Sequence, residues 1–351
     1  MNEGRRIVIL AEGAFGSFSS KTGVGALRYI PDEVVAVIDS TKSGNVVDDI
    51  IGYGNGCPIV ASLEEALQYR PNTLLIGVAP RGGVLPEEWR DIIREAIEHR
   101  MTIVNGLHFF LSDDEAFASL ARRKGVVIED LRKPPRELPI ASGAARHIDS
   151  HVVLTVGSDC DTGKMTVTFE LFKEARLREL AADCIPTGQT GMLVWGKGVA
   201  IDRVAGDFMA GTVEKMVLES SIRADWIFVE GQGSLFHPGY SGVTLALLHG
   251  CAPQALVLCH QPSRKYIGEY LGDTSFPIPP LPQVIRLYEE AAHWIRTTKV
   301  VAIALNCYDL TEKEIAETID RIEDETKIPT TDCIKFGAAK LMDALEDSLC
   351  D

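Results

Sequence analysis

The sequence has few of the features that identify metal-binding, disulfide-rich or membrane proteins. Its eight cysteines include no C-x-x-C pair, so neither a zinc cage nor a disulfide framework is indicated. Eighteen apolar residues never follow one another, and the apolar run after the first basic residues is too short for a signal peptide. We therefore expect a cytoplasmic protein that binds no membrane.

Positive charge is also scarce. The chain has 35 lysines and arginines against 50 aspartates and glutamates, which gives a formal net charge of -15. Proteins that bind nucleic acids do so through clustered basic residues. The charge balance therefore argues against nucleic acid as the main partner, and an acidic substrate would have to be bound by local basic residues.

Length and residue pattern predict two α/β domains. A chain of 351 residues exceeds what one hydrophobic core usually serves. In the first third, β-rich runs alternate with helical patterns, which is typical of a parallel sheet flanked by helices. The expected strands are 6–10, 34–38, 73–78, 102–105 and 126–128, and the expected helices are 62–69 and 86–99. A proline-rich stretch then separates a Rossmann-like domain, residues 1–132, from a second α/β domain, residues 151–351, with a linker over 133–150.

The first domain offers two possible ligand-binding positions. Asp39 ends the second predicted strand, where a ribose can be held, but the glycines after the first strand do not form G-x-G-x-x-G. Arg81 follows a later strand beside flexible glycines, at the strand end where open α/β sheets bind ligands. We assign Arg81 to substrate binding, although a solvated surface turn fits the same residues.

The clearest chemical signal lies at the start of the second domain. An apolar run ends at Gly157, a polar loop follows, and Gly163-Lys164 opens a helical pattern over 164–178. Strand, loop and helix in this order predict a P-loop, in which main-chain N–H groups and the lysine bind phosphate. Gly157, Asp159, Gly163 and Lys164 are therefore expected to bind the cofactor.

This loop differs from the common P-loop in two ways. Five residues rather than four separate Gly157 from Gly163, and Met165 stands where a serine or threonine hydroxyl normally reaches Mg²⁺. Thr166 can supply that hydroxyl if the helix starts one residue late, so it is a candidate for binding the cofactor and Mg²⁺. Without such a hydroxyl, phosphate binding is favoured over hydrolysis.

Three further polar segments follow predicted strands on the same side. Gln189 lies in a small, polar stretch that we expect to be a flexible loop near the ligand. Glu230 comes directly after an apolar strand, where P-loop proteins hold Mg²⁺, although a carboxylate can also cap a strand end. Asn306 follows a late strand and can read a purine edge, although asparagine also begins turns. The expected strands are 152–156, 227–229, 255–259 and 300–305, with further helices at 282–297 and 311–326.

Two side chains near these strand ends add possible chemistry. His237 follows the Glu230 loop and can act as an acid or base near neutral pH. Arg264, beside another cation, follows the strand 255–259 and can clamp a substrate carboxylate. For both residues a solvated or structural role is an alternative.

The assembled motifs resemble known families. The G-x5-G-K loop and the Val229-Glu230-Gly231 pattern resemble the dethiobiotin synthetase group of P-loop proteins. A closer resemblance covers nearly the whole chain, through GSDCDTGKMT, TGQTG, VEGQGS and APRGG. It is to a family long described as a domain of unknown function and now as D-glutamate N-acetyltransferase-like, in which a Rossmann-like domain precedes a P-loop domain.

The resemblance implies acetyl transfer from acetyl-CoA to the amine of an amino acid, D-glutamate in the family's description. Glu230 or His237 would then act as base or metal anchor, with a small molecule as partner and a homo-oligomer as the expected assembly. An ATP- and Mg²⁺-dependent, carboxylate-activating ligase and a nucleotide-binding sensor without turnover stay open as alternatives.

Overall fold

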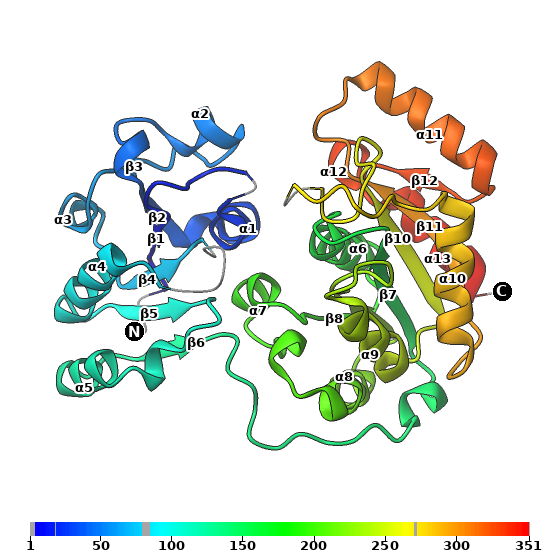
Figure 1. Cartoon of the computed structure of the whole chain (residues 1–351), viewed down its shortest axis with the longest axis horizontal. Coiled ribbons are helices and arrows are strands. Elements are labelled where there is room, and N and C mark those ends of the chain that lie inside the picture. The colour runs from blue at the N-terminus through cyan, green and yellow to red at the C-terminus, as the bar shows by residue number, and fades with distance from the viewer. Residues whose placement is uncertain (1–3, 18, 79–84, 270–271, 351) are drawn as a thin grey trace. The chain divides into compact units, whose positions relative to one another are not determined.

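The chain forms two compact units, each with its own parallel sheet (Figure 1). The computed structural model describes residues 4–17, 19–78, 85–269 and 272–350. Unit 1 consists of Met1–Pro134 and Gln189–Ala200, and unit 2 consists of Pro135–Gly188 and Ile201–Asp351.

The sheet of unit 1 has the strand order β3-β2-β1-β4-β5-β6 with parallel pairing. This is the strand order of Rossmann folds, which confirms the predicted fold of this domain. β1 is entirely apolar and buried, as expected for a strand covered by helices on both faces. The strands are β1 (Ile7–Leu10), β2 (Val34–Ile38), β3 (Ile59–Val60), β4 (Thr73–Ile76), β5 (Thr102–Asn105) and β6 (Ile128–Asp130). The α-helices between them are α1 (Lys21–Tyr29), α2 (Val47–Ile51), α3 (Leu63–Ala66), α4 (Glu87–Glu98) and α5 (Glu115–Lys124).

Asp39, at the end of β2, has a structural role. Its buried carboxylate accepts hydrogen bonds from the N–H groups of Gly13, Phe15 and Thr41 at distances of 3.2, 2.9 and 3.0 Å. Lys42 Nζ lies 3.1 Å from the same carboxylate. Although burial acts to raise it, the hydrogen bonds from Thr41 and Phe15 hold the pKa of Asp39 below its usual value. The carboxylate therefore shapes the loop after β1, and the structure does not support a ribose-binding role.

A helix from the second half of the chain also belongs to unit 1. α7 (Gln189–Trp195) packs against α1, and the hydroxyl oxygens of Thr22 and Thr190 lie 3.2 Å apart. Arg132 donates a hydrogen bond to the amide oxygen of Gln189 at 2.6 Å. The expected flexible loop is thus a helix whose first residue is anchored in unit 1.

The sheet of unit 2 has the order β12-β11-β10-β7-β9-β8, again with parallel pairing. β7 is central, so the loop after it lies between the segments that follow β9 and β10. Since parallel strands end at one edge, this topology brings the predicted phosphate loop and Glu230 together. The strands are β7 (His151–Gly157), β8 (Ala182–Ile185), β9 (Trp226–Val229), β10 (Ala255–His260), β11 (Lys299–Leu305) and β12 (Thr330–Thr331).

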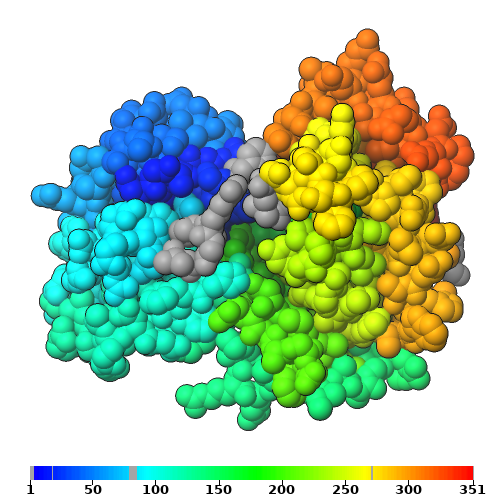
Figure 2. All heavy atoms as spheres, in the orientation of Figure 1, coloured from blue at the N-terminus to red at the C-terminus, as the bar shows by residue number. Residues whose placement is uncertain are grey.

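The helices of unit 2 differ in how much of their surface is covered. α11 buries only Ile315 and Ile322 and forms an exposed flank of the unit, in orange in Figure 2. Its start has the capping box of Thr311 and Glu314. The helices are α6 (Lys164–Leu177), α8 (Gly206–Ser221), α9 (Ser241–Cys251), α10 (Leu281–His293), α11 (Glu312–Thr326), α12 (Cys333–Phe336) and α13 (Ala339–Leu349). Over the described residues, no helix combines the length and apolarity needed to cross a membrane.

Replacing Asp39 with alanine should lower the free energy of unfolding by about 2 to 4 kcal/mol, because several buried N–H groups lose their acceptor. Urea denaturation of the whole chain measures this. Asp32→Ala, at an exposed position of the same unit, is the control and should change stability by less than about 0.5 kcal/mol. Equal stability of the two variants would contradict the structural role of Asp39.

Candidate functional site

The phosphate loop, residues 157–164, connects β7 to α6. A Cβ on Gly157 would come within 2.7 Å of Lys164 Nζ, so only glycine lets the lysine fold over the loop. Gly163 has a φ of +101°, in the left-handed region that favours glycine. The two glycines of the motif thus have separate tasks, one making room for the lysine and the other turning the chain into α6.

Lys164 is nearly buried and lies at the first residue of α6. Its Nζ donates to the main-chain carbonyl of Asp159 at 2.8 Å. The ammonium and the positive end of a 14-residue helix therefore meet at this loop. Together they favour an anion such as a phosphate group.

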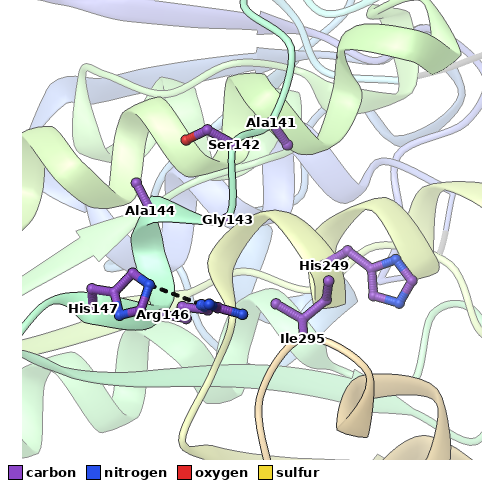
Figure 3. A pocket seen from close by; sticks show the side chains of 8 residues that line it. All are labelled: Ala141, Ser142, Gly143, Ala144, Arg146, His147, His249 and Ile295. Atoms are coloured by element: carbon purple, nitrogen blue, oxygen red, sulfur yellow. Dashed lines mark hydrogen bonds between the residues drawn. The ribbon is translucent and has the colours of Figure 1, made fainter.

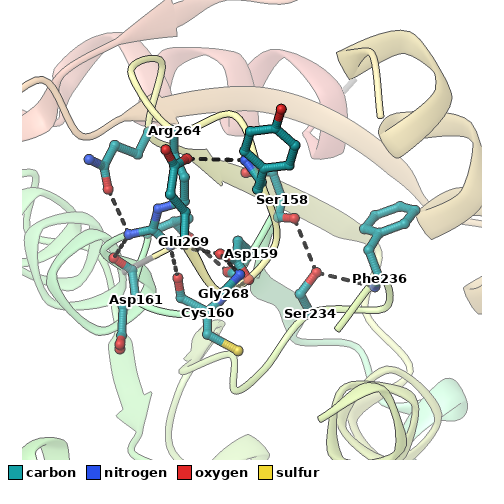
Figure 4. A network of polar contacts seen from close by, with 12 residues as sticks. Ser158, Asp159, Cys160, Asp161, Ser234, Phe236, Arg264, Gly268 and Glu269 are labelled. Carbon is teal, nitrogen blue, oxygen red and sulfur yellow. Dashed lines mark hydrogen bonds and ion pairs between the residues drawn. The ribbon is translucent and has the colours of Figure 1, made fainter. Parts of the chain in front are cut away.

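The side chain of Asp159 ties the loop to the segment after β10 (Figure 4). Its carboxylate accepts hydrogen bonds from Arg264 Nη1 and from the Gly268 N–H, both at 2.9 Å, and from the Cys160 N–H at 2.7 Å. Arg264 also donates to the Cys160 carbonyl and, at 2.7 Å, to the side chain of Gln261. Neither side chain of the ion pair is exposed by more than 7%.

These contacts change the interpretation of both charged residues. Arg264 was predicted to clamp a substrate carboxylate, but its guanidinium is buried among acceptors of its own chain. Asp159 was predicted to bind the cofactor, but its carboxylate is occupied by N–H donors and would repel a phosphate. Both residues therefore act by fixing the shape of the loop.

Glu230 is a buried carboxylate at the end of β9, with an exposed fraction of 4%. Its Oε2 accepts hydrogen bonds from the N–H groups of Thr187 and Gly188 at 2.9 and 3.2 Å, and its Oε1 accepts from Gln232 at 3.1 Å. Burial raises the pKa of Glu230 to about 7, against the opposing effect of these donors and of Lys164. A carboxyl group with this pKa can exchange a proton near neutral pH.

Gly231 brings the Glu230 segment against the phosphate loop. Its N–H donates to the hydroxyl of Thr155 at 3.0 Å. A Cβ at this position would lie 1.8 Å from the Thr155 carbonyl oxygen and 3.1 Å from Lys164 Cδ. Glu230, one residue before it, is thereby held beside the lysine.

The residues predicted for Mg²⁺ do not form the expected arrangement. α6 begins at Lys164 rather than one residue later, so the condition under which Thr166 would replace the missing hydroxyl is not met. Glu230 already accepts hydrogen bonds on both oxygens. Met165, at the usual metal-binding position, has no oxygen ligand.

His237 lies beside the loop in a fixed orientation. Its Nδ1 accepts the Gly239 N–H at 3.1 Å, and its ring packs on Tyr240 with centroids 4.4 Å apart. One ring nitrogen of His237, one carboxylate oxygen of Asp159 and the Cys160 thiol lie within 4.8 Å of one another. Because Nδ1 is an acceptor, the neutral ring carries its proton on Nε2 and acts there as a donor rather than a base.

The other predicted site residues are more dispersed. Asn306 follows β11, and its main-chain N–H donates to the main-chain carbonyl of His260 at 2.8 Å. β11 lies two strands from β7, so Asn306 is roughly 10 Å from the phosphate loop by strand spacing. The side chain of Gln189 is held within unit 1. Arg81 lies outside the described residues.

The structure adds two residues that the sequence did not identify as part of the site, the buried Tyr288 and the half-buried His260. The hydroxyl of Tyr288, on α10, donates to the Gly157 carbonyl at 2.7 Å and accepts the Leu235 N–H at 3.2 Å. His260 Nδ1 lies 2.9 Å from the hydroxyl of Ser158, and burial, with the charges of neighbouring arginines, lowers the pKa of His260 to about 4. Tyrosine inside an amphipathic helix and histidine at a strand end carry no motif that would have identified them.

A separate groove of about 600 Å³ lies elsewhere on unit 2 (Figure 3). Arg146 and His147, which are joined by a hydrogen bond of 2.9 Å, line it together with His249. Arg146 and His147 come shortly before β7 in the chain, so they lie toward the opposite end of that strand from the phosphate loop. Among the predicted site residues that the structure describes, none lines this groove.

The comparisons with known proteins identify the family. A family model described as "Domain of unknown function (DUF1611_C) P-loop domain" matches residues 139–342, and one described as "Domain of unknown function (DUF1611_N) Rossmann-like domain" matches residues 40–134. The chain belongs to the DUF1611 family. This confirms the resemblance inferred from the motifs. It also confirms the predicted Rossmann-like and P-loop folds of the two domains.

Relatives of this DUF1611 chain include named enzymes and a solved structure. It is 35% identical over 331 residues to a protein from Tritonibacter scottomollicae named D-glutamate N-acetyltransferase, covering 93% of this chain and 94% of that protein. A protein of the same name from Pseudoalteromonas sp. is 35% identical over 302 residues, covering 84% and 88%. The crystal structure of a DUF1611 family protein from Anabaena variabilis superposes with a TM-score of 0.94 at 42% identity, covering 98% of this chain and 100% of that one.

Gly231→Ala should disrupt the junction between β9 and the phosphate loop, because the added methyl overlaps the Thr155 carbonyl. We expect a loss of at least about 2 kcal/mol in the free energy of unfolding, measured by urea denaturation. Gly242→Ala, where a Cβ meets nothing within 4 Å, is the control and should leave stability unchanged or raise it by up to about 1 kcal/mol. A tolerated Gly231→Ala would contradict the close approach of these segments.

Proposed function

We propose that this DUF1611 protein is an N-acetyltransferase that transfers the acetyl group of acetyl-CoA to the amine of an acidic amino acid. D-glutamate is the first substrate to test, because two relatives that span most of the chain carry its name. The observation that carries the proposal is the buried Glu230 beside Lys164, with a pKa of about 7.

Glu230 serves as the general base in this proposal. Amide formation requires the attacking amine to lose a proton, and a positioned carboxylate whose pKa lies near the working pH accepts it efficiently. The Thr187 and Gly188 N–H groups hold the carboxylate in place without supplying a competing proton acceptor. His237, whose Nε2 carries the proton, acts as a hydrogen-bond donor beside the loop rather than as a second base.

The phosphate loop binds the phosphates of acetyl-CoA, which supplies the acetyl group as a thioester. Lys164 and the N-terminus of α6 provide positive charge for this task, and phosphate binding of this kind needs no metal ion. The carboxylates of the amino acid require a further cation. Arg81 stays a prediction for this role, while Arg264 is committed to Asp159.

The ATP-dependent ligase alternative has less support from the residues of the loop. Phosphoryl transfer uses the lysine together with a hydroxyl on Mg²⁺ and a strand-end acid. Here Met165 lacks the hydroxyl, and the strand-end acid Glu230 is enclosed by N–H donors. The nucleotide-sensor alternative does not explain why Glu230, at the same edge of the sheet as the phosphate loop, has a pKa near 7.

Ligand binding and product formation together test the proposal. Thermal-shift titrations with acetyl-CoA, with ATP in the presence and absence of Mg²⁺, and with NADH identify the ligand. Mass spectrometry of D-glutamate and L-glutamate incubated with acetyl-CoA then detects N-acetylation. We expect stabilisation by acetyl-CoA and acetylated D-glutamate. Magnesium-dependent stabilisation by ATP alone would favour the ligase, and tight binding without product would favour the sensor.

Lys164→Ala should weaken acetyl-CoA binding by about 10- to 100-fold, because one charge-assisted hydrogen bond to phosphate is lost. Isothermal titration measures the affinity, and circular dichroism verifies the fold. Lys173→Ala, at an exposed lysine of the same helix, is the matched control and should bind normally. Unchanged affinity in Lys164→Ala would refute the assignment of the phosphate loop.

Glu230→Gln should reduce kcat by about 100- to 10,000-fold, because the amide cannot accept the proton of the amine. In the unmodified enzyme only the carboxylate form is active, so kcat/KM should rise with pH and level off above about 7. This fall of kcat/KM toward low pH, the acid limb of the pH profile, should be absent from the residual activity of Glu230→Gln. Glu317→Gln, on exposed α11, is the control, and an acid limb that survives in Glu230→Gln would exclude Glu230 as the base.

A further inference from the structure

The groove of about 600 Å³ on unit 2 has the size of a small-molecule binding site. It lies between the segment 141–147, which comes before β7, and the C-terminal ends of α9 and α10 (Figure 3). This is the end of the sheet away from the phosphate loop, so the proposed acetyl transfer gives the groove no task. Its walls and charges therefore need their own account.

One wall of this groove is held in place by a buried carboxylate. Glu214, on α8, accepts hydrogen bonds from the N–H and the hydroxyl of Ser142 at 2.7 and 2.9 Å, and from the Ala145 N–H at 3.5 Å. Although burial acts to raise it, these hydrogen bonds hold the pKa of Glu214 below its usual value. A Cβ on Gly211, also on α8, would lie 2.0 Å from the Pro139 carbonyl oxygen, so the chain lies directly against this helix. The wall is therefore a fixed part of unit 2 rather than a loose linker.

Arg146 brings a positive charge to this groove without an acidic partner. Its Nε donates to His147 Nε2 at 2.9 Å, so the proton of this neutral imidazole lies on Nδ1. Among the described residues, no carboxylate forms an ion pair with Arg146, and none of those that line the groove is acidic. Figure 3 shows the guanidinium between His147 and Ile295. Its two terminal nitrogens are therefore available to a ligand, in a protein whose net charge is -15.

A second arginine follows the lining residue Ile295 in the chain. Arg296 has a buried Nη1 with no hydrogen-bond partner among the described residues. Burial lowers the pKa of His151, at the start of β7, and the charge of Arg296 lowers it further against the opposing charge of Asp225. Arg146 and Arg296 thus both contribute positive potential at this end of the sheet, which favours an anionic ligand.

The remaining lining residues favour a ligand with an apolar body. Ala141, Ala144 and Ile295 line the groove with apolar side chains. The planar guanidinium of Arg146 matches a single carboxylate, which it can bind through paired hydrogen bonds. A phosphate group with more than one negative charge would meet only one permanent cation among the described lining residues, and it has no apolar surface to bury. A monocarboxylate with a hydrocarbon chain satisfies both kinds of lining residue.

We propose that this groove is a second ligand site, which binds a small organic acid with one carboxylate and an apolar body. The carboxylate oxygens accept hydrogen bonds from the terminal nitrogens of Arg146, and the apolar body packs on Ala141, Ala144 and Ile295. No bond is made or broken in this step, and the phosphate loop takes no part in it. The proposal therefore goes beyond acetyl transfer, and it can be tested without an activity assay.

The test is isothermal titration of the full chain with hexanoate, whose hydrocarbon chain and single carboxylate represent the proposed ligand class. We expect saturable binding with a Kd of about 1 mM or tighter. Binding of 1-hexanol, which lacks the charge, and of acetate, which lacks the apolar body, should each be at least about tenfold weaker. Saturating inorganic pyrophosphate should leave the Kd of hexanoate unchanged, because it occupies the phosphate loop and is a poor ligand for the groove.

A matched pair of variants places the binding at the groove. Arg146→Gln should weaken hexanoate binding by about 10- to 100-fold, whereas Arg176→Gln, at an exposed arginine of α6, should bind normally. Circular dichroism verifies the fold of both, and the titrations of the unmodified chain do not depend on either variant. The proposal would be overturned by the absence of saturable hexanoate binding, by equal affinity for 1-hexanol, by displacement with pyrophosphate, or by unchanged affinity in Arg146→Gln.

Discussion

The buried ion pair between Asp159 and Arg264 holds together the two segments that form the phosphate loop and its neighbour after β10. Both charges are removed from water, and such pairs persist only when additional hydrogen bonds satisfy the remaining donors and acceptors. Here the N–H groups of Cys160 and Gly268 complete the set on the carboxylate. The aspartate is thus accommodated inside the loop, because its carboxylate pairs with Arg264, whereas Lys164 donates to the main-chain carbonyl of Asp159.

The same edge of the sheet contains a second carboxylate with a different environment. Glu230 accepts hydrogen bonds from the N–H groups of Thr187 and Gly188, but no ion pair among the described contacts includes it. Burial therefore dominates and raises the pKa of Glu230. The two carboxylates therefore divide into Asp159, which is held by an arginine and N–H donors, and Glu230, whose pKa burial raises to about 7. This division follows from what each carboxylate contacts.

Sequence patterns predicted the features that depend on short stretches of chain. β2 and β5 begin and end where predicted, and the Rossmann-like and P-loop units follow from alternating strands and helices. α9 escaped prediction because its sequence is apolar on most sides, which gives no helical periodicity. The roles of Arg264 and Asp159 could not be predicted from the sequence either, because these two partners lie about a hundred residues apart in the chain. Glu230 was found by its place after an apolar strand, but its three N–H donors were not.

The assignment of α7 to unit 1 bears on how the protein can be divided. The chain passes from one unit to the other at Pro134, returns at Gln189 and leaves again after Ala200. A fragment that ends in the linker therefore lacks the helix that packs on α1, and the remaining fragment keeps a helix without its packing surface. Each unit has its own core, but each is built from two separate stretches of the chain. Neither unit can therefore be exchanged or expressed as one continuous segment of the gene.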